Sequence, residues 1–167
     1  MLIFFDTEFS GLTSDPRLLS IGFVADDGSE LYVEFLDGWS EENCSPWVRE
    51  HVLPLLGDGE LLTRRDAARR IHLWLTSIEK EPTVMGETDW DTTLLANLLR
   101  ENHIAPDSCA LLKILNKISK SQVKSFEVAK QSYFDSNGVT QHQALNDARA
   151  FRVAWHMIFS NSCDSGD

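Results

Sequence analysis

Two carboxylates lie close together near the start of the chain, in the run Asp6-Thr7-Glu8. The apolar residues before them give the segment 2–9 the composition of a β-strand. Side chains two residues apart on a strand point to the same face, so Asp6 and Glu8 should converge beside the core. Neighbouring anions in such a place repel and are poorly solvated, and a bound cation relieves both costs. Hard oxygen ligands favour Mg²⁺ or Mn²⁺ over Zn²⁺.

A third carboxylate occupies an unusual position near the end of the chain. Asp147 falls in a predicted helix over residues 143–159, only about 60° from the centre of the apolar stripe. A carboxylate there needs a partner. His142 precedes the helix and can reach over the same end, and an imidazole with an ordinary pKa near 6.5 suits a general base at neutral pH. Taken alone, His142 fits a capping or surface role as well.

An acidic turn between these two ends offers a fourth ligand. Residues 86–95 read Gly-Glu-Thr-Asp-Trp-Asp-Thr-Thr-Leu-Leu and lead into a helix predicted over residues 90–102. Asp and Thr are favoured at helix N-termini because their oxygens cap backbone N–H groups and because the helix dipole favours negative charge. By this argument both Asp89 and Asp91 are helix caps. Local physics therefore leaves two candidates for one ligand.

The elements that must position these residues are predicted to form a mixed sheet covered by helices. An Asp-Gly step at 27–28 between two apolar runs predicts a hairpin, so the sheet should open with an antiparallel three-stranded meander. Thr63 and Asp66 form the pattern of a capping box that begins a helix ending near Ser77. Residues 109–115 fit either a fifth strand or the start of a helix. The remaining predicted strands are 2–9, 18–25, 30–36 and 83–86.

Length and composition describe one domain. A chain of 167 residues with 43% hydrophobic content can bury a sizeable core, and we expect a single domain over residues 1–159 and a disordered tail over 160–167. Three cysteines form no CxxC pair, which is typical of a reducing compartment and predicts a cytoplasmic protein. No apolar run approaches the roughly 20 residues of a membrane helix, so no membrane partner is expected.

The formal net charge of −11 argues at first against a nucleic-acid partner, because such proteins usually carry a basic surface that neutralises phosphates. The basic residues are concentrated, however, and nine of the fifteen lie in two short segments. Each segment alone fits a solvated helix face, and together they could follow a nucleic-acid strand. These residues are Arg64, Arg65, Arg69, Arg70, Lys113, Lys117, Lys120, Lys124 and Lys130.

Two motifs at the ends of the chain resemble those of the DEDDh 3′-5′ exonucleases, a family that includes proofreading subunits, oligoribonuclease relatives and tRNA-trimming ribonucleases. Residues 6–12, Asp-Thr-Glu-Phe-Ser-Gly-Leu, resemble the opening DxET-x-G-L motif, with Phe9 in place of a small polar residue. His142 and Asp147-Ala148 resemble the H-x4-D-A motif. The histidine disfavours the tyrosine-bearing sister group. The compact bacterial and phage exoribonuclease-like members are the most similar.

A third motif is similar to the family's aromatic-Asp step followed by leucine four residues later. Trp90-Asp91 and Leu95 match it better than any frame that uses Asp89. The chain departs from the family just before this step, where an asparagine or serine is replaced by the run 87–89, Glu-Thr-Asp. This departure adds negative charge near the expected site. It bears on how the penultimate phosphate is held.

The resemblance implies a ribonuclease-H-like fold, with a mixed five-stranded sheet that starts as an antiparallel meander, continues with parallel strands and is flanked by helices. It also implies a two-metal phosphodiester hydrolase that uses Mg²⁺ or Mn²⁺ and releases nucleoside 5′-monophosphates from a 3′ end. His142 would be the general base. The metal ligands would be Asp6, Glu8, Asp91 and Asp147.

The resemblance further places the end of the substrate against Phe9, Ser10, Gly11 and Leu12. The backbone of Phe9 and Ser10 would contact the terminal sugar, and Leu12 would wedge against the last bases. Simple packing under the loop is the alternative for Leu12. RNA is favoured over DNA, and a DNA-trimming exonuclease of the same family is the alternative. Related enzymes can form homodimers in which one subunit's basic face serves the other's site, and the sequence leaves this open.

Two functions of other classes stay open at this point. The same fold could serve as a catalytically silent nucleic-acid-binding module, against which the intact metal and base residues argue. A calcium-binding structural protein would carry its acidic ligands in one loop, whereas these candidates run from residue 6 to residue 147.

Overall fold

The first three strands form the predicted antiparallel meander. β1 (Leu2–Phe9), β2 (Leu18–Ala25) and β3 (Glu30–Phe35) pair in sequence order. The hairpin between β2 and β3 turns at Gly28, whose φ of 87° is accessible to glycine at little steric cost.

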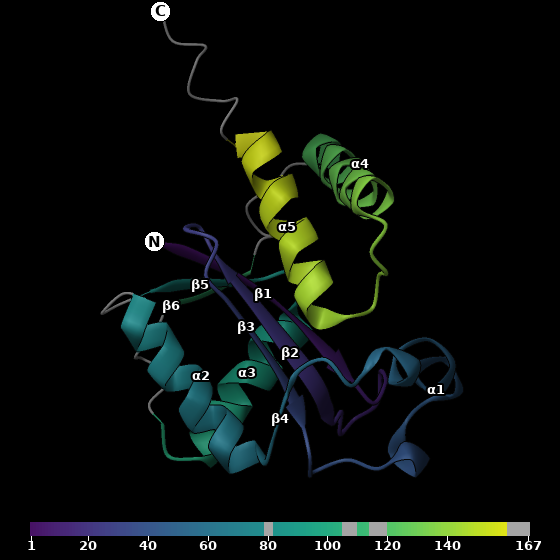
Figure 1. Cartoon of the computed structure of the whole chain (residues 1–167), viewed down its shortest axis with the longest axis vertical. Coiled ribbons are helices and arrows are strands. Elements are labelled where there is room, and N and C mark those ends of the chain that lie inside the picture. Colours follow the sequence, from purple (N-terminus) through teal and green to yellow (C-terminus); the bar gives the residue numbers. More distant parts are fainter. Residues whose placement is uncertain (79–81, 105–109, 114–119, 160–167) are drawn as a thin grey trace, which may run out of the picture.

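The computed structural model describes residues 1–78, 82–104, 110–113 and 120–159, and Figure 1 shows their arrangement.

Three shorter strands complete a six-stranded mixed sheet in the order β4-β3-β2-β1-β5-β6. β5 (Thr83–Gly86) runs parallel to β1, β6 (Ala110–Lys113) runs parallel to β5, and β4 (Glu60–Leu62) runs parallel to β3. The predicted fold class is confirmed. β4 adds an edge strand that the sequence did not predict, because three residues are too short for a periodic pattern. Of the ambiguous segment 109–115, residues 110–113 form a strand, and the rest lies outside the described residues.

The helices predicted after Thr63, over residues 90–102 and over residues 143–159 are present. The Thr63 hydroxyl accepts a hydrogen bond from the Asp66 N–H at 3.2 Å, which confirms the predicted cap. No helix in the described ranges is long and apolar enough to cross a membrane. Residues 160–167, the expected tail, lie outside the described residues. The helices are α1 (Pro46–His51), α2 (Arg64–Ile78), α3 (Asp89–Glu101), α4 (Lys120–Asn137) and α5 (Ala144–Phe159), with two 3₁₀ turns at Glu41–Asn43 and Leu53–Leu55.

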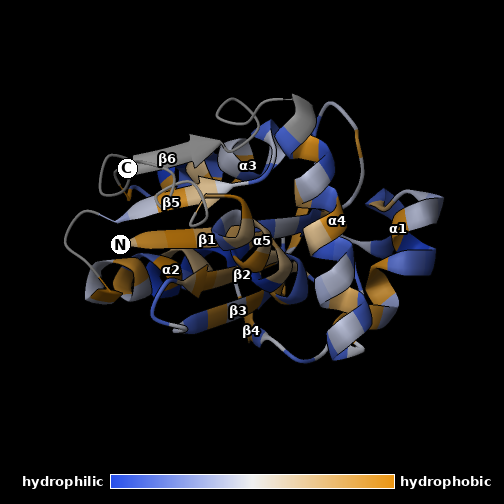
Figure 2. Ribbon diagram, turned by 90° about the horizontal axis from the view of Figure 1, so that it is seen from above, coloured by the Kyte–Doolittle hydropathy of each residue, from blue (hydrophilic) through white to orange (hydrophobic). Residues whose placement is uncertain are grey.

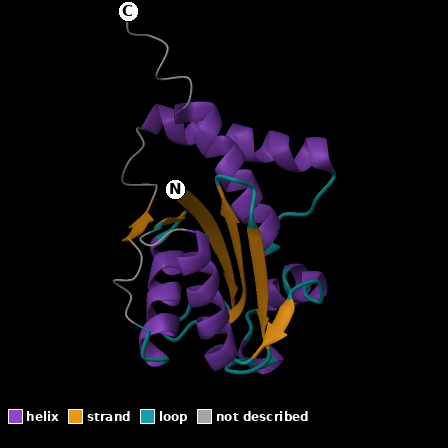
Figure 3. Cartoon of the chain, turned by 60° about the vertical axis from the view of Figure 1, so that its left-hand side comes forward, coloured by secondary structure: helices purple, strands orange, loops and turns teal. Residues whose placement is uncertain are grey.

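The alternation of side chains along β1 divides the core into two layers. Ile3 and Phe5 point to one face, where they join the apolar residues of α2 and α3. Phe4 points to the other face and packs with Phe151 of α5, with ring centroids 5.1 Å apart. Figure 2 shows β1 as a largely hydrophobic strand, and Figure 3 shows helices on both sides of the sheet. Asp6 has the same parity as Phe4 and therefore faces α5.

Gly22 of β2 allows α5 to lie directly on the sheet. Gly22 is the cross-strand partner of Asp6, and a Cβ atom built at Gly22 would lie 2.4 Å from the Cα atom of Leu145. Real Cβ atoms do not approach backbone so closely, so only glycine fits here. The first turn of α5 is thereby brought next to Asp6, and with it Asp147.

We expect Gly22→Ala to lower the free energy of unfolding by about 1–3 kcal/mol or more, because the helix backbone cannot yield as a flexible side chain can. The same variant should bind Mn²⁺ more weakly, because α5 carries Asp147. Urea denaturation and titration calorimetry measure the two effects. Gly138→Asn is the matched control, since Gly138 has a φ of 61° that asparagine tolerates and no atom within 4 Å of its Cβ position. An unchanged urea midpoint for Gly22→Ala would contradict the packing argument.

Candidate metal centre

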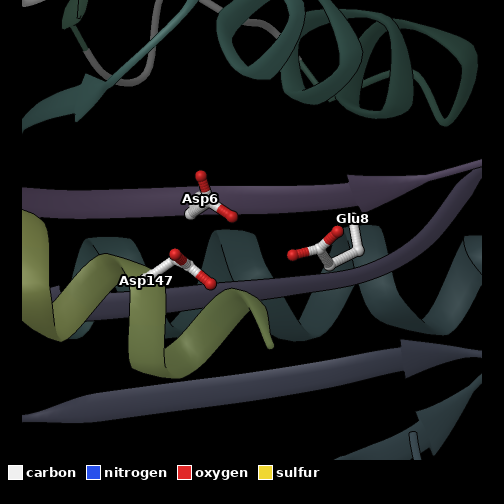
Figure 4. Close-up of side chains that lie close together, drawn as sticks. All are labelled: Asp6, Glu8 and Asp147. Atoms are coloured by element: carbon white, nitrogen blue, oxygen red, sulfur yellow. The ribbon is translucent and has the colours of Figure 1, made fainter. Parts of the chain in front are cut away.

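Three of the predicted ligands meet at the junction of β1 and α5. Asp6 and Glu8 project from β1, and Asp147 projects from the first turn of α5. One side-chain oxygen from each lies within 4.8 Å of the others. Figure 4 shows the three carboxylates turned toward a common point. Strand parity and helix position thus bring together residues from opposite ends of the chain.

The electrostatics of this cluster are unfavourable to three free carboxylates. Loss of hydration, and then the charges of Asp91, Asp147 and Glu8, raise the pKa of Asp6 well above its usual value. Loss of hydration and the charges of Asp147 and Asp91 raise the pKa of Glu8 to about 8. The pKa of Asp147 rises to about 6, mainly through loss of hydration, and the nearby Lys130 opposes this rise. The folded protein therefore favours either protonation of these groups or a bound cation.

The donor set fits a divalent cation. Oδ2 of Asp147 is buried and has no hydrogen-bond partner among the described residues. A buried oxygen left without a donor is costly, and a metal ion supplies the missing positive charge. All three ligands are carboxylates, which suits Mg²⁺ or Mn²⁺. Asp6, Glu8 and Asp147 are thus the residues that would hold the ion.

Asp91 is placed differently from the other three. It reaches the end of β1 from α3, on the opposite side of the sheet, and only 2% of its surface is exposed. Its Oδ1 accepts hydrogen bonds from the N–H and hydroxyl of Thr7, at 3.2 and 2.6 Å. Its Oδ2 accepts from the N–H and hydroxyl of Thr88, at 2.8 and 2.7 Å, in a reciprocal capping box. Asp91 is therefore the N3 residue of the capping box, with Thr88 as the N-cap, and it also lines the pocket of the cluster; its role as a ligand stays a prediction.

His142 lines the same pocket as the three clustered carboxylates. Its backbone has a φ of 65°, just before α5 begins. Its ring packs edge-on against Trp47 of α1, with centroids 4.8 Å apart and planes at 84°. Burial, and then the charges of His51 and Lys130, lower the pKa of His142 below its usual value. The imidazole is therefore mostly neutral at pH 7 and can accept a proton.

An apolar pocket of about 430 Å³ adjoins the cluster and shares Glu8, Phe9 and Leu12 with it. Leu12 is 77% exposed, so the alternative that it merely packs under the loop is wrong. The ring of Phe9 stacks on Trp90 at 5.8 Å. Trp47 completes the wall, and no sequence motif had singled it out. An exposed tryptophan in a short helix carries no sequence signal of its own.

Ser10 and Gly11 form the turn beside this pocket. The side chain of Ser10 is buried, and its hydroxyl accepts a hydrogen bond from the N–H of Arg17 at 3.0 Å. The Ser10 hydroxyl is therefore already engaged in holding the turn. Gly11 adopts a φ of 136°, and its Cβ position would lie 3.1 Å from Cβ of Ser45. Contact between the substrate and this turn stays a prediction that concerns the backbone.

Two arginines of the first basic segment are not placed as the sequence suggested. Arg64 and Arg70 lie on α2, which covers the face opposite α5, and they pair with Glu101 at 2.7 Å and Glu60 at 2.9 Å. These arginines do not surround the carboxylates. Lys130 is largely buried in a pair with Glu87, so it does not belong to a solvated helix face. The side chains of Lys113, Lys117 and Lys120 lie outside the described residues.

Known proteins match the chain in part of its sequence and in its fold, although no family model matches it. A 3′-5′ exoribonuclease of Mycobacterium tuberculosis is 45% identical over 56 residues, which are 34% of this chain and 33% of the relative. The match thus spans about a third of the curated relative's length. E. coli exonuclease I in complex with a dA13 oligonucleotide superimposes with a TM-score of 0.61 at 14% identity. That alignment covers 96% of this chain and 40% of the other.

The chain has the fold of exonuclease I. The zinc-bound E. coli exonuclease I complex with single-stranded DNA superimposes similarly, with a TM-score of 0.62 at 14% identity, over 96% of this chain and 40% of that one. Both the exonuclease I structures and the exoribonuclease are consistent with the DEDDh resemblance of the three motifs.

We expect the metal-free protein to lose stability as the pH rises from about 4 to about 8. In this window the folded state binds more protons than the unfolded state, because the folded pKa values are about 6 for Asp147 and about 8 for Glu8. The stability gained from protonating Asp147 and Glu8 in the folded protein is fully present below the pKa that these groups have in the unfolded chain. It is lost as the pH rises through their raised pKa in the folded protein. Urea denaturation in EDTA at several pH values measures it.

The variant Glu8→Gln separates this effect from the titration of other groups. Without metal it should be more stable than the wild type at pH 8, and the difference should shrink toward pH 5. Saturating Mn²⁺ should reverse the order at pH 8. A difference that does not change with pH would mean that Glu8 is not protonated more readily in the folded state.

Proposed function

We propose that this protein is a metal-dependent 3′-5′ exonuclease that hydrolyses single-stranded or 3′-overhanging nucleic acid, with RNA favoured, to nucleoside 5′-monophosphates. The observation that carries the proposal is the convergence of Asp6, Glu8 and Asp147 within 4.8 Å, with one buried carboxylate oxygen that has no hydrogen-bond partner among the residues the structure describes. Three repelling carboxylates with His142 in the same pocket suit metal-assisted phosphodiester hydrolysis better than a structural role.

Different residues of the chain would hold the metal ions and accept the proton in such a reaction. Asp6, Glu8 and Asp147 would hold one metal, and Asp6 with Asp91, directly or through water, would hold a second. When bound, the two ions activate water and stabilise the leaving 3′ oxygen. Neutral His142 accepts the proton of the attacking water, and its edge contact with Trp47 restricts the orientation of the ring.

The apolar pocket supports a site for the end of the strand. Exposed Leu12 stands between the pocket of the carboxylates and the pocket lined by Trp47, so a terminal base can lie against apolar walls while its phosphate faces the metal ligands. Every base has a flat apolar face, so this arrangement is tolerant of sequence. The preference for RNA rests on the partial match to a protein named an exoribonuclease. The exonuclease I complexes with DNA oligonucleotides keep DNA as the alternative.

A pair of variants separates the general base from the metal ligands. We expect His142→Ala to lower the rate by about 10²–10⁴-fold with little change in Mn²⁺ affinity, because it removes a proton acceptor and no ligand. Asp147→Asn should abolish both hydrolysis and tight Mn²⁺ binding while the protein stays folded. A nuclease assay, calorimetry and circular dichroism on both variants measure this. If His142→Ala stops binding metal, His142 is a ligand, and if Asp147→Asn turns over normally, the site is misassigned.

The ribose preference can be tested on the first cleavage alone. We expect an all-RNA oligonucleotide to be cut about 5- to 150-fold faster than one with a single 3′-terminal deoxynucleotide, because a lost hydrogen bond to the 2′-hydroxyl costs roughly 1–3 kcal/mol. Both substrates must be compared at one salt concentration, since phosphate contacts make affinity salt-dependent. Equal rates, or faster removal of the deoxynucleotide, would favour DNA trimming. If neither oligonucleotide is cleaved, whether or not EDTA is present, the protein would instead be a catalytically silent nucleic-acid-binding module.

A further inference from the structure

A buried ion pair lies beside the metal ligands, at the point where the chain departs from the family motif. Glu87 directly follows β5, and its Oε2 accepts a hydrogen bond from Nζ of Lys130 on α4 at 2.6 Å. Only 13% of the Lys130 side chain and 16% of the Glu87 side chain are exposed. An ion pair this deeply buried is not explained by stability, because desolvation of both charges offsets much of their attraction.

The register of the sheet places Glu87 next to Asp6. β5 runs parallel to β1 with Gly86 opposite Phe5, so Glu87, the residue that follows β5, comes beside Asp6 in the middle of β1. Loss of hydration is the main cause of the raised pKa of Asp6 and of Asp147, and the charge of Glu87 adds a smaller contribution to both. Glu87 is therefore a further acidic residue within electrostatic reach of a cluster that already repels itself.

Lys130 acts on the same groups with the opposite sign. Its charge lowers the pKa of Asp147, and Asp6 and Asp147 in turn help to raise the pKa of Lys130. An ammonium on a flexible four-carbon stem could form an ion pair directly with these carboxylates if nothing else held it. In that position it would occupy the place of a divalent ion. The described structure instead directs it to Glu87.

We propose that Glu87 is a positioning residue that holds the ammonium of Lys130 at the end of β5, away from the oxygens of the carboxylate cluster, and so keeps the metal position open. The proposal rests on the proposed function, because it presupposes that Asp6, Glu8 and Asp147 bind a divalent ion. Held by Glu87, Lys130 still offsets part of the cluster's negative charge. Released from Glu87, it competes with the metal for the same oxygens.

Substitutions of Glu87 and of Lys130 should therefore change Mn²⁺ affinity in opposite directions. If the ion pair served only stability, the two substitutions would not have opposite effects on Mn²⁺ affinity. Glu87→Gln should weaken Mn²⁺ binding by about 10- to 100-fold, because it frees Lys130 to pair with Asp6 or Asp147. Lys130→Met should bind Mn²⁺ at least as tightly as the wild type, because it removes the competitor. The double variant Glu87→Gln/Lys130→Met should recover Mn²⁺ affinity to within about threefold of the wild type.

Titration calorimetry with Mn²⁺ is the measurement, with thermal melts in EDTA to confirm that each variant is folded. Glu30→Gln is the matched control, since it breaks another ion pair of 2.6 Å, with Arg149 of α5, that does not border the cluster, and it should leave Mn²⁺ affinity unchanged. In nuclease assays, Glu87→Gln should need more Mn²⁺ for half-maximal rate yet approach the wild-type rate at saturation. If Glu87→Gln does not fold, Glu87→Asp should show a smaller loss, again reversed by Lys130→Met.

The outcomes separate this inference from the proposed function. Wild-type protein that binds no Mn²⁺ would overturn the metal site itself. Wild-type binding with equal affinity in Glu87→Gln, or weakened binding in the double variant as severe as in Glu87→Gln, would overturn only the role of Glu87. Weakened binding in Lys130→Met would show instead that Lys130 supports the site directly, which also contradicts the proposal.

Discussion

Three carboxylates that share a space of less than 5 Å are the constraint on which this structure depends. Asp6, Glu8 and Asp147 repel one another and have lost much of their hydration, so the cluster opposes folding in the absence of a cation. The apolar layers must outweigh that cost. The contact of Phe4 with Phe151, and the seat of α5 on Gly22, hold the helix against β1 even though their carboxylates repel.

The two aspartates Asp91 and Asp147 differ in how far the fold itself satisfies their carboxylate oxygens. Asp91 accepts four hydrogen bonds and ties α3 to the end of β1 through Thr7, so its charge is dispersed over donors already in place. Asp147 leaves one buried oxygen unpartnered in the described structure. A protein that needed both only for stability would satisfy both. The unsatisfied oxygen therefore points to a cation more directly than the number of acidic residues does.

The residues around the carboxylate cluster affect its local charge and the kind of ligand that can approach it. Glu87 and Lys130 add a buried pair of opposite charges at the end of β5. On the other side Leu12 and Trp47 border an apolar pocket next to the carboxylates. A charged site with one apolar wall suits a ligand with an anionic phosphate and a flat base. The overall negative charge of the chain does not conflict with this, because a bound metal ion would supply local positive charge.

The sequence by itself determined the meander, the mixed sheet and the convergence of Asp6 with Glu8, because strand periodicity and the Asp-Gly turn are local properties. It identified Asp147 and His142 through a polar residue near an apolar stripe and through the family resemblance. It did not reveal the depth at which α5 lies on Gly22, the burial of Lys130, or the engagement of Asp91 and Ser10 by neighbouring donors. Those features depend on which elements pack together, and only the tertiary structure decides whether a charged or polar side chain finds its partner within the fold or is left for a ligand.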